Sequence, residues 1–271
     1  MRALAAQWKQ AGKTVAFVPT SGALHPGHAE LIALADSKAD LVVVSCFANP
    51  LAFGPSENFS AFPRSPADDL KLCEELQVDA VFMPPTEELF PRGHSSYVIE
   101  EAVSKPLCGV SRPTHFRGVT TGMAKLLNIV RPDLLVLGQR DAQQVAVIRK
   151  MIADLCFGVE VVVAPTRREI DGLAIAVRNR DLTARQREEA LSISASLQQA
   201  REMVAQGVRS PDRVIAEVTH RLGEKRTIRV IYVAIVDPNT MEPMRDVVPG
   251  RTLLTIAVWS DEVRLIDNIL L

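Results

Sequence analysis

The chain has 271 residues, 47% of them apolar, and its 31 basic and 32 acidic residues leave a net charge of −1. Because acids and bases are mixed along the chain, the composition argues against nonspecific nucleic-acid binding, which requires a concentrated basic face. No apolar run approaches the ~20 residues of a membrane-spanning helix, and the N-terminus is too polar and short for a signal peptide. We therefore expect a cytoplasmic protein that binds neither nucleic acid nor membranes.

The first part of the chain alternates between apolar runs and helical patterns. We expect a helix over residues 3–10, a buried strand over residues 15–18, a Pro-Thr-Ser-Gly turn, and a helix from about residue 27. Residues 41–47 form a second apolar run without polar alternation, which is typical of a strand covered on both faces in a parallel sheet. Residues 48–59 are rich in Pro, Gly and Asn, which predicts an irregular loop where open α/β sheets bind ligands.

The same alternation continues to residue 163. A helix is predicted over residues 65–76, with Ser65 as its N-cap and Pro66 at its first position. The later strands are predicted over residues 79–83, 134–137 and 159–163, and the later helices over residues 119–130 and 142–156. The last of these helices has four apolar residues on one face: Val145, Ile148, Ile152 and Leu155. The segments between these elements are predicted to be loops over residues 84–93 and 108–117 and a short extended piece over residues 97–100.

The remainder of the chain has a different pattern. A charged loop over residues 167–181 leads into two long helices, over residues 183–206 and 210–222. Strand-like runs follow over residues 228–236, 253–258 and 262–266. We expect a Rossmann-like doubly wound α/β domain over residues 1–165 and a smaller C-terminal α+β lid domain over residues 166–271.

The four cysteines show no C-x-x-C spacing, which a zinc or dithiol site would require. Cys46, Cys73 and Cys156 lie within apolar strand or helix patterns. This setting predicts small core residues in a reducing compartment.

His25 and His28 lie three residues apart where the first loop runs into a helix. Free backbone N–H groups and the positive end of the helix dipole suit a phosphate there, and Gly27 allows close backbone approach. A histidine pair that only caps the helix is the alternative. Metal binding is the third option and the least favoured, because no third ligand lies at a recognisable spacing. The segment P-T-S-G-A-L-H-P-G-H resembles the H-x-G-H element of the nucleotidylyl transferase superfamily.

Two further segments carry residues suited to phosphate. In G-Q-R-D-A-Q-Q, residues 138–144, Gly138 permits close approach and Arg140 offers a fixed positive fork, whereas Asp141 alone would be an N-cap. Gln143 and Gln144 would be surface residues if the segment had no ligand. In R-E-I-D-G-L-A-I-A-V-R-N-R, residues 168–180, three arginines form either a solvated face or a phosphate clamp on a moving domain.

These segments, together with F-A-N-P-L-A-F-G-P and S-R-P-T-H-F-R-G-V, occur in the order and at about the spacing of the pantoate–β-alanine ligase (pantothenate synthetase) family. The resemblance covers nearly the whole chain. It implies a Rossmann-like domain with a smaller C-terminal domain, usually in a homodimer. It also implies an enzyme that uses ATP and Mg²⁺ to adenylate the carboxylate of pantoate, releasing pyrophosphate. β-Alanine then attacks the acyl adenylate, which gives pantothenate and AMP.

The resemblance also assigns roles to residues of this chain. The residues implied in catalysis are His25, His28, Arg140 and Arg178. Those implied in ATP binding are the same four with Gly138 and Asp141. Those implied in binding the acid substrate are Ser21, Asn49, Ala52, Arg112 and Gln144. No residue is implied as a metal ligand.

The chain departs from the family pattern at both ends of this site. In the acid pocket, the family's methionine, glutamine, glutamate and glycine are replaced by Ser21, Ala52, Cys108 and Thr114, respectively. Ser21 is smaller than methionine and opens space, and Thr114 is expected to fill some of it. At the phosphates, its lysine is replaced by Arg140 and its two serines by Ala176 and Val177.

Several functions remain compatible with these changes. The acid is pantoate or, in a diverged paralogue, another acid, and the amine is β-alanine or a relative. Two further alternatives are a nucleotidylyltransferase without the amide-forming step and a non-catalytic nucleotide-binding relic.

Overall fold

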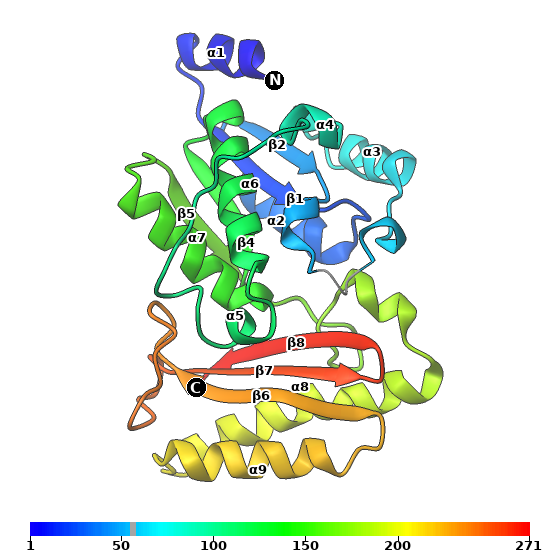
Figure 1. Cartoon of the computed structure of the whole chain (residues 1–271), viewed down its shortest axis with the longest axis vertical. Coiled ribbons are helices and arrows are strands. Elements are labelled where there is room, and N and C mark those ends of the chain that lie inside the picture. The colour runs from blue at the N-terminus through cyan, green and yellow to red at the C-terminus, as the bar shows by residue number, and fades with distance from the viewer. Residues whose placement is uncertain (55–57) are drawn as a thin grey trace.

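The computed structural model describes residues 1–54 and 58–271, and its larger unit is a parallel β-sheet covered by helices on both faces (Figure 1). Five strands in the order β3-β2-β1-β4-β5 form this sheet: β1 (Val15–Thr20), β2 (Leu41–Cys46), β3 (Ala80–Phe82), β4 (Leu134–Gly138) and β5 (Glu160–Ala164). The prediction of a doubly wound parallel sheet is confirmed.

Residues of β1 alternate between two apolar clusters, which explains why both faces of the sheet are covered. Phe17 packs with Leu127 and Ile148 on one face, and Val18 packs with Ile32 and Val44 on the other. These side chains are at most 2% exposed. The helices of this unit are α1 (Arg2–Gln10), α2 (Pro26–Asp36), α3 (Pro66–Glu75), α4 (Thr86–Leu89), α5 (Cys108–Ser111), α6 (His115–Val130) and α7 (Ala142–Asp154).

The C-terminal unit is an antiparallel sheet with two helices on one face. It contains α8 (Ala184–Ala205), α9 (Pro211–Gly223), β6 (Ile228–Val236), β7 (Leu253–Ser260) and β8 (Val263–Leu270). A mixed apolar cluster joins it to the parallel sheet, where Phe116 and Val147 pack with Val236 and Leu253. The smaller α+β unit is thus as expected, while the domain boundary at residue 165 stays a prediction.

The sequence-based boundaries are wrong where short helices occur. The predicted loops over residues 84–93 and 108–117 contain α4, α5 and the first turn of α6. The extended piece at residues 97–100 joins no sheet. The hydroxyl of Thr121 accepts from the N–H of Val98, and the hydroxyl of Thr120 donates to its carbonyl, so both backbone groups already have side-chain partners. Residues 50–52 and 59–61 of the predicted 48–59 loop form 3₁₀ turns, while residues 55–57 of that prediction lie outside the described residues.

Two residues assigned to the core lie at the surface. Helix α7 ends at Asp154, so Leu155 no longer shares its apolar face and is 51% exposed. Cys156 follows in the left-handed region at φ 55° and is exposed, because it turns the chain toward β5. Cys73 is buried as predicted and Cys46 is half-buried. Within the described ranges, no helix has both the length and the apolar character that a bilayer crossing would need.

Candidate active site

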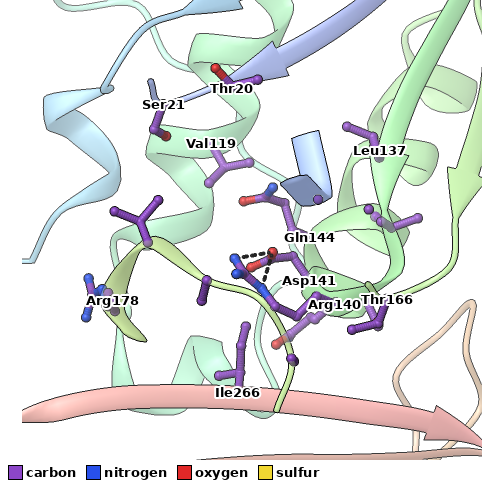
Figure 2. Close-up of a pocket in the computed structure, with 18 of the residues that line it drawn as sticks. Thr20, Ser21, Val119, Leu137, Arg140, Asp141, Gln144, Thr166, Arg178 and Ile266 are labelled. Carbon is purple, nitrogen blue, oxygen red and sulfur yellow. Dashed lines mark hydrogen bonds and ion pairs between the residues drawn. The ribbon is translucent and has the colours of Figure 1, made fainter. Parts of the chain in front are cut away.

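A cavity of about 430 Å³ lies between the carboxyl ends of the parallel strands and the C-terminal sheet (Figure 2). The segments after β1, β2, β4 and β5 and the strand β8 all contribute to its walls. Every site residue predicted from the sequence lines this cavity: Ser21, His25, His28, Asn49, Ala52, Arg112, Gly138, Arg140, Asp141, Gln144 and Arg178. The structure therefore brings together segments that are up to 157 residues apart in the chain.

The two histidines stack against each other at the start of α2. Their ring centroids are 3.9 Å apart, and Nδ1 of His28 accepts a hydrogen bond from the backbone N–H of His25 at 3.2 Å. Because Nδ1 accepts, the proton of a neutral His28 ring is on Nε2, which is available as a donor. Nδ1 of His25 is buried and has no hydrogen-bond partner. The pair therefore caps the helix in part and keeps polar atoms for a ligand.

Burial keeps both histidines neutral. Burial, with Arg140 and Arg180 nearby, lowers the pKa of His25 to about 4. Burial and the neighbouring His25 lower the pKa of His28 to about 3. At neutral pH the pair therefore offers neutral donors and acceptors, and it adds no positive charge to the site.

Gly27 is required by the histidine pair itself. A Cβ at this position would lie 3.0 Å from Cε1 and 3.1 Å from Nδ1 of His25. The sequence predicted that a ligand would lie close to the Gly27 backbone. In the structure, the ring of His25 lies there. The glycine lets that ring pack over the first turn of α2, where Pro26 has no N–H and the N–H groups of His28 and Ala29 bond to the carbonyl of His25.

The guanidinium of Arg140 is held in place from two sides. Its Nε and Nη2 donate to one carboxylate oxygen of Asp141 at 3.2 and 2.9 Å, and Nη1 donates to the carbonyl of Ile175 at 2.9 Å (Figure 2 shows the first pair). Asp141 stands at the N-cap position of α7, as expected, but its side chain makes no cap bond to the helix. Its carboxylate orients Arg140 instead. Arg178 comes from the 3₁₀ turn Val177–Asp181 on the other wall.

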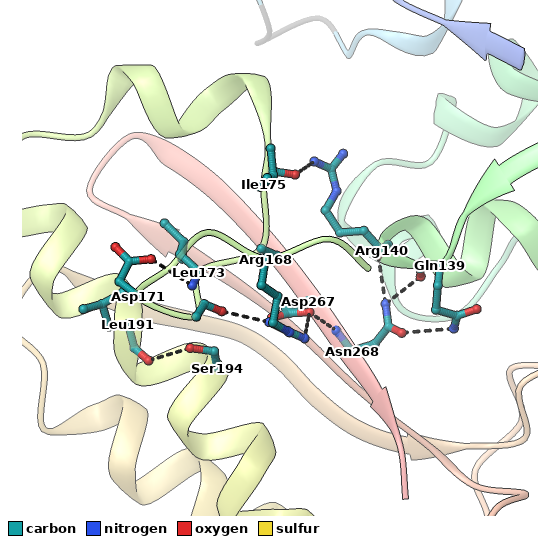
Figure 3. Close-up of polar contacts among 12 residues, drawn as sticks. Gln139, Arg140, Arg168, Asp171, Leu173, Ile175, Leu191, Ser194, Asp267 and Asn268 are labelled. Carbon is teal, nitrogen blue, oxygen red and sulfur yellow. Dashed lines mark hydrogen bonds and ion pairs between the residues drawn. The ribbon is translucent and has the colours of Figure 1, made fainter. Parts of the chain in front are cut away.

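Strand β8 fixes both arginine-bearing loops (Figure 3). The Nδ2 of Asn268 donates to the carbonyls of Gln139 and Arg140 at 3.0 and 2.9 Å. The neighbouring Asp267 is 3% exposed and accepts two bonds from Arg168, at 2.6 and 3.0 Å. Burial raises the pKa of Asp267, and Arg168 opposes that shift. The C-terminal sheet thus positions both the turn that carries Arg140 and the loop that leads to Arg178.

Three of the residues implied for the acid, Asn49, Ala52 and Arg112, lie on the cavity wall around the 3₁₀ turn Pro50–Ala52 and the start of α6, whereas Ser21 follows β1 and Gln144 belongs to α7. The side chain of Asn49 accepts from Leu51 N–H at 3.0 Å and donates to the carbonyl of Gly118 at 2.8 Å. Nη2 of Arg112 donates to the carbonyl of Ala52 at 3.1 Å. Asn49 and Arg112 therefore shape this wall through the backbone that they hold.

The substituted positions divide between the cavity and the surface. The cavity-lining members are Ser21, Ala52, Cys108, Arg140, Ala176 and Val177. Thr114 is exposed and serves as the N-cap residue of α6, so the expectation that it fills space in the acid pocket is wrong. Both Gln143 and Gln144 line the cavity, and Gln143 is 7% exposed and bonds to three backbone groups of residues 103–108. Neither glutamine is a plain surface residue.

Sequence reasoning missed two contributors to this site. Asp69 of α3 is 3% exposed and accepts from the backbone N–H groups of Ala23 and Leu24 at 3.0 and 2.6 Å, just before His25. Arg264 of β8 is 9% exposed and lines the cavity with Tyr232 of β6. The one available signal for Arg264 was a charged residue inside an apolar strand pattern.

The described residues contain no group of three or more histidine, cysteine or acidic side chains that could hold a metal ion. Two carboxylates line the cavity within the described ranges, those of Asp141 and Asp267. Both are paired with arginines, Arg140 and Arg168. These residues alone do not form a metal cage.

Comparisons with known proteins agree over the whole chain. The family model described as pantoate-beta-alanine ligase matches residues 1–270. A pantothenate synthetase of Moorella thermoacetica is 44% identical over 268 residues, which cover 97% of this chain and 93% of that protein. The crystal structure of pantothenate synthetase from Thermus thermophilus matches with a TM-score of 0.93 at 38% identity, covering 98% of this chain and 97% of that one. A pantoate-beta-alanine ligase from Francisella tularensis, complexed with beta-gamma ATP and beta-alanine, matches with a TM-score of 0.77 at 30% identity, covering 96% and 90%.

Proposed function

The chain belongs to the pantoate–β-alanine ligase family, and from that premise we propose that it joins pantoate to β-alanine at the expense of ATP. In the first step a carboxylate oxygen of pantoate attacks the α-phosphorus of ATP, which forms pantoyl adenylate and releases pyrophosphate. In the second step the amine of β-alanine attacks the acyl carbon, which forms the amide and releases AMP. The convergence of all predicted site residues on one cavity is the observation that carries this proposal.

We assign the phosphates of ATP to the start of α2 and the arginines opposite it. The helix end supplies the backbone N–H of Gly27 and a positive dipole, because Pro26 has no N–H and those of His28 and Ala29 bond to the carbonyl of His25. The Nε2–H of His28 adds a neutral donor beside them. Arg140 and Arg178 supply positive charge where negative charge develops during adenylation. Gly138, the last residue of β4, leaves open space beside its backbone and lets the nucleotide approach there.

We propose that Mg²⁺ enters with ATP as part of the substrate. Mg²⁺ is commonly held by substrate phosphates with only one or two protein carboxylates, which fits a cavity whose carboxylates are already paired with arginines. When bound, it would neutralise phosphate charge. Asp141 is the cavity carboxylate at the turn that we assign to the phosphates.

We assign the acid to the wall formed by Ser21, Asn49, Ala52, Arg112 and Gln144. Gln144 keeps an amide there for a hydroxyl or carboxylate of the acid. Ala52 and Cys108 offer no strong hydrogen-bonding group at their positions. We also propose, from the family resemblance alone, that the protein is a cytoplasmic homodimer.

Product analysis tests this proposal. The purified protein is incubated with ATP, Mg²⁺ and pantoate, with and without β-alanine, and the products are separated. We expect pyrophosphate and AMP, with an amide formed only when β-alanine is present. ADP and inorganic phosphate would overturn the proposal. AMP transfer without amide formation in the presence of β-alanine would favour the nucleotidylyltransferase alternative instead.

A further inference from the structure

Arg264 carries a buried positive charge whose partners are uncharged. Its Nη1 and Nη2 donate to the hydroxyl of Ser111 at 3.2 and 3.1 Å, and Nη2 also contacts the sulfur of Cys108 at 3.4 Å. The side chain is 9% exposed and lines the cavity. No carboxylate of residues 1–54 or 58–271 forms an ion pair with it.

This arrangement is costly for the protein alone. A buried guanidinium is normally compensated by a carboxylate, because a hydroxyl and a thiol supply dipoles but no opposite charge. The position beside it that could have supplied a carboxylate is Cys108, where the resembled family has glutamate. An anionic group of a ligand in the cavity would supply the charge that Cys108 does not.

Tyr232 places a second donor next to Arg264. Its hydroxyl lies 3.1 Å from the sulfur of Cys108, and its side chain lines the same cavity. Burial, followed by the influence of Cys108, raises the pKa of Tyr232, so that its phenol keeps its proton. A planar guanidinium and a neutral phenol together suit the two oxygens of a carboxylate.

We propose that Arg264 and Tyr232 form a subsite for the carboxylate of the amine substrate. This inference rests on the proposed function and adds Arg264 as a residue that recognises the carboxylate of β-alanine. The carboxylate of pantoate is consumed by adenylation, and we assign the phosphates of ATP to α2, Arg140 and Arg178. The β-alanine carboxylate is the remaining anionic group, and it stays unreacted through both steps.

The test separates the two half-reactions in the full-length protein. Pantoate-dependent exchange of pyrophosphate into ATP, without amine, reports adenylation. Amide formation with β-alanine or with propylamine, which lacks the carboxylate, reports the second step. The variants are Arg264→Met and Arg264→Lys, with Arg229→Met as a matched control, because Arg229 is an exposed arginine on β6 of the same sheet.

We expect Arg264→Met to raise the KM for β-alanine about 10- to 100-fold, because the substrate carboxylate loses a hydrogen-bonded charge partner. Pyrophosphate exchange and the constants for propylamine should stay unchanged. Arg264→Lys should fall between wild type and Arg264→Met, and Arg229→Met should behave as wild type. Wild type should strongly prefer β-alanine to propylamine.

Two results would overturn the subsite: an unchanged KM for β-alanine in Arg264→Met, or an equal loss with propylamine or in pyrophosphate exchange. If Arg264→Met does not fold, Arg264→Lys and the wild-type preference decide, and equal use of β-alanine and propylamine by wild type refutes the subsite. Absence of pantoate-dependent exchange in wild type would instead overturn the proposed function, and the subsite with it.

Discussion

The imidazole rings of His25 and His28 stack with their centroids 3.9 Å apart and their planes at 29°. Nδ1 of His28 accepts from the backbone N–H of His25 at the start of α2, while Nδ1 of His25 has no hydrogen-bond partner. The two histidines therefore differ in role although they belong to one motif. We propose that His28 combines a cap with a donor for the ligand, whereas Nδ1 of His25 has no hydrogen-bond partner and its side chain contributes less to holding the helix end.

We expect His25→Ala and His28→Ala each to lower turnover by about 10²- to 10³-fold, because positioned donors act on developing phosphate charge. His28→Ala should also cost about 1 kcal/mol of stability through the lost cap, and His25→Ala less. Steady-state kinetics and thermal unfolding of each variant give both quantities. A large drop in melting temperature with wild-type turnover per folded molecule would assign the pair a purely structural role.

The histidine pair predicts a specific dependence of stability on pH. Folding lowers the pKa of His25 to about 4 and that of His28 to about 3, against an ordinary value near 6.5 in the unfolded chain. The unfolded state therefore binds more protons between these values, and the contribution of the pair is present above pH ~6.5 and is lost as the pH falls toward 3. Denaturant titrations should show a weaker loss of stability on acidification in His25→Gln and His28→Gln. Equal slopes in wild type and both variants would contradict this.

Gly122→Ala should damage the acid-binding wall. A Cβ on Gly122 would lie 2.4 Å from Nδ2 of Asn49, whose side chain holds the turn that carries Ala52. Overpacking of this kind costs about 1–3 kcal/mol, and displacement of the turn should raise the KM for pantoate. Thermal unfolding and kinetics measure both effects. The control is Gly223→Ala, whose Cβ meets nothing within 4 Å, and an equal effect in both variants would sink the prediction.

Arg168→Met should destabilise the protein by about 3 kcal/mol, because it leaves the buried carboxylate of Asp267 without its partner. The matched control is Arg167→Met. Arg167 pairs with Glu30 at 2.9 Å, but both side chains are about half exposed, so its loss should cost less than about 1 kcal/mol. Denaturant unfolding of the two variants makes the comparison. If both variants lost less than about 1 kcal/mol of stability, the Arg168–Asp267 pair would not stabilise the protein measurably.

Ala52→Gln should lower the KM for pantoate by up to about tenfold, because the new amide can form one hydrogen bond to the substrate. The reason is that Ala52 lines the cavity without a polar side chain, where the resembled family has glutamine. Kinetics over a panel of hydroxy acids should show pantoate gaining more than acids that lack its hydroxyl groups. If Ala52→Gln weakens pantoate binding, or another acid is preferred by wild type, the pocket is adapted to a different acid.

The sequence alone was sufficient for the fold class and for the segments that meet at the cavity. Continuous apolar runs such as β1 and β2 indicate a parallel sheet, and the turns that follow parallel strands must share one edge. That is why His25 and Arg140 could be placed in one site. The boundaries failed at α4, α5 and the start of α6, because such short segments carry too little periodicity to predict.

Only the tertiary structure decided what surrounds these residues. The contact between Ser111 and Arg264 spans 153 positions, and that between Arg168 and Asp267 spans 99. The first joins α5 to β8 where the C-terminal sheet packs on the parallel unit, and the second joins the loop after β5 to β8. No local sequence pattern encodes either contact. Burial, His25 and Arg140 lower the pKa of His28, so its charge state follows from the assembled cavity, whereas its place at a helix start follows from the neighbouring residues.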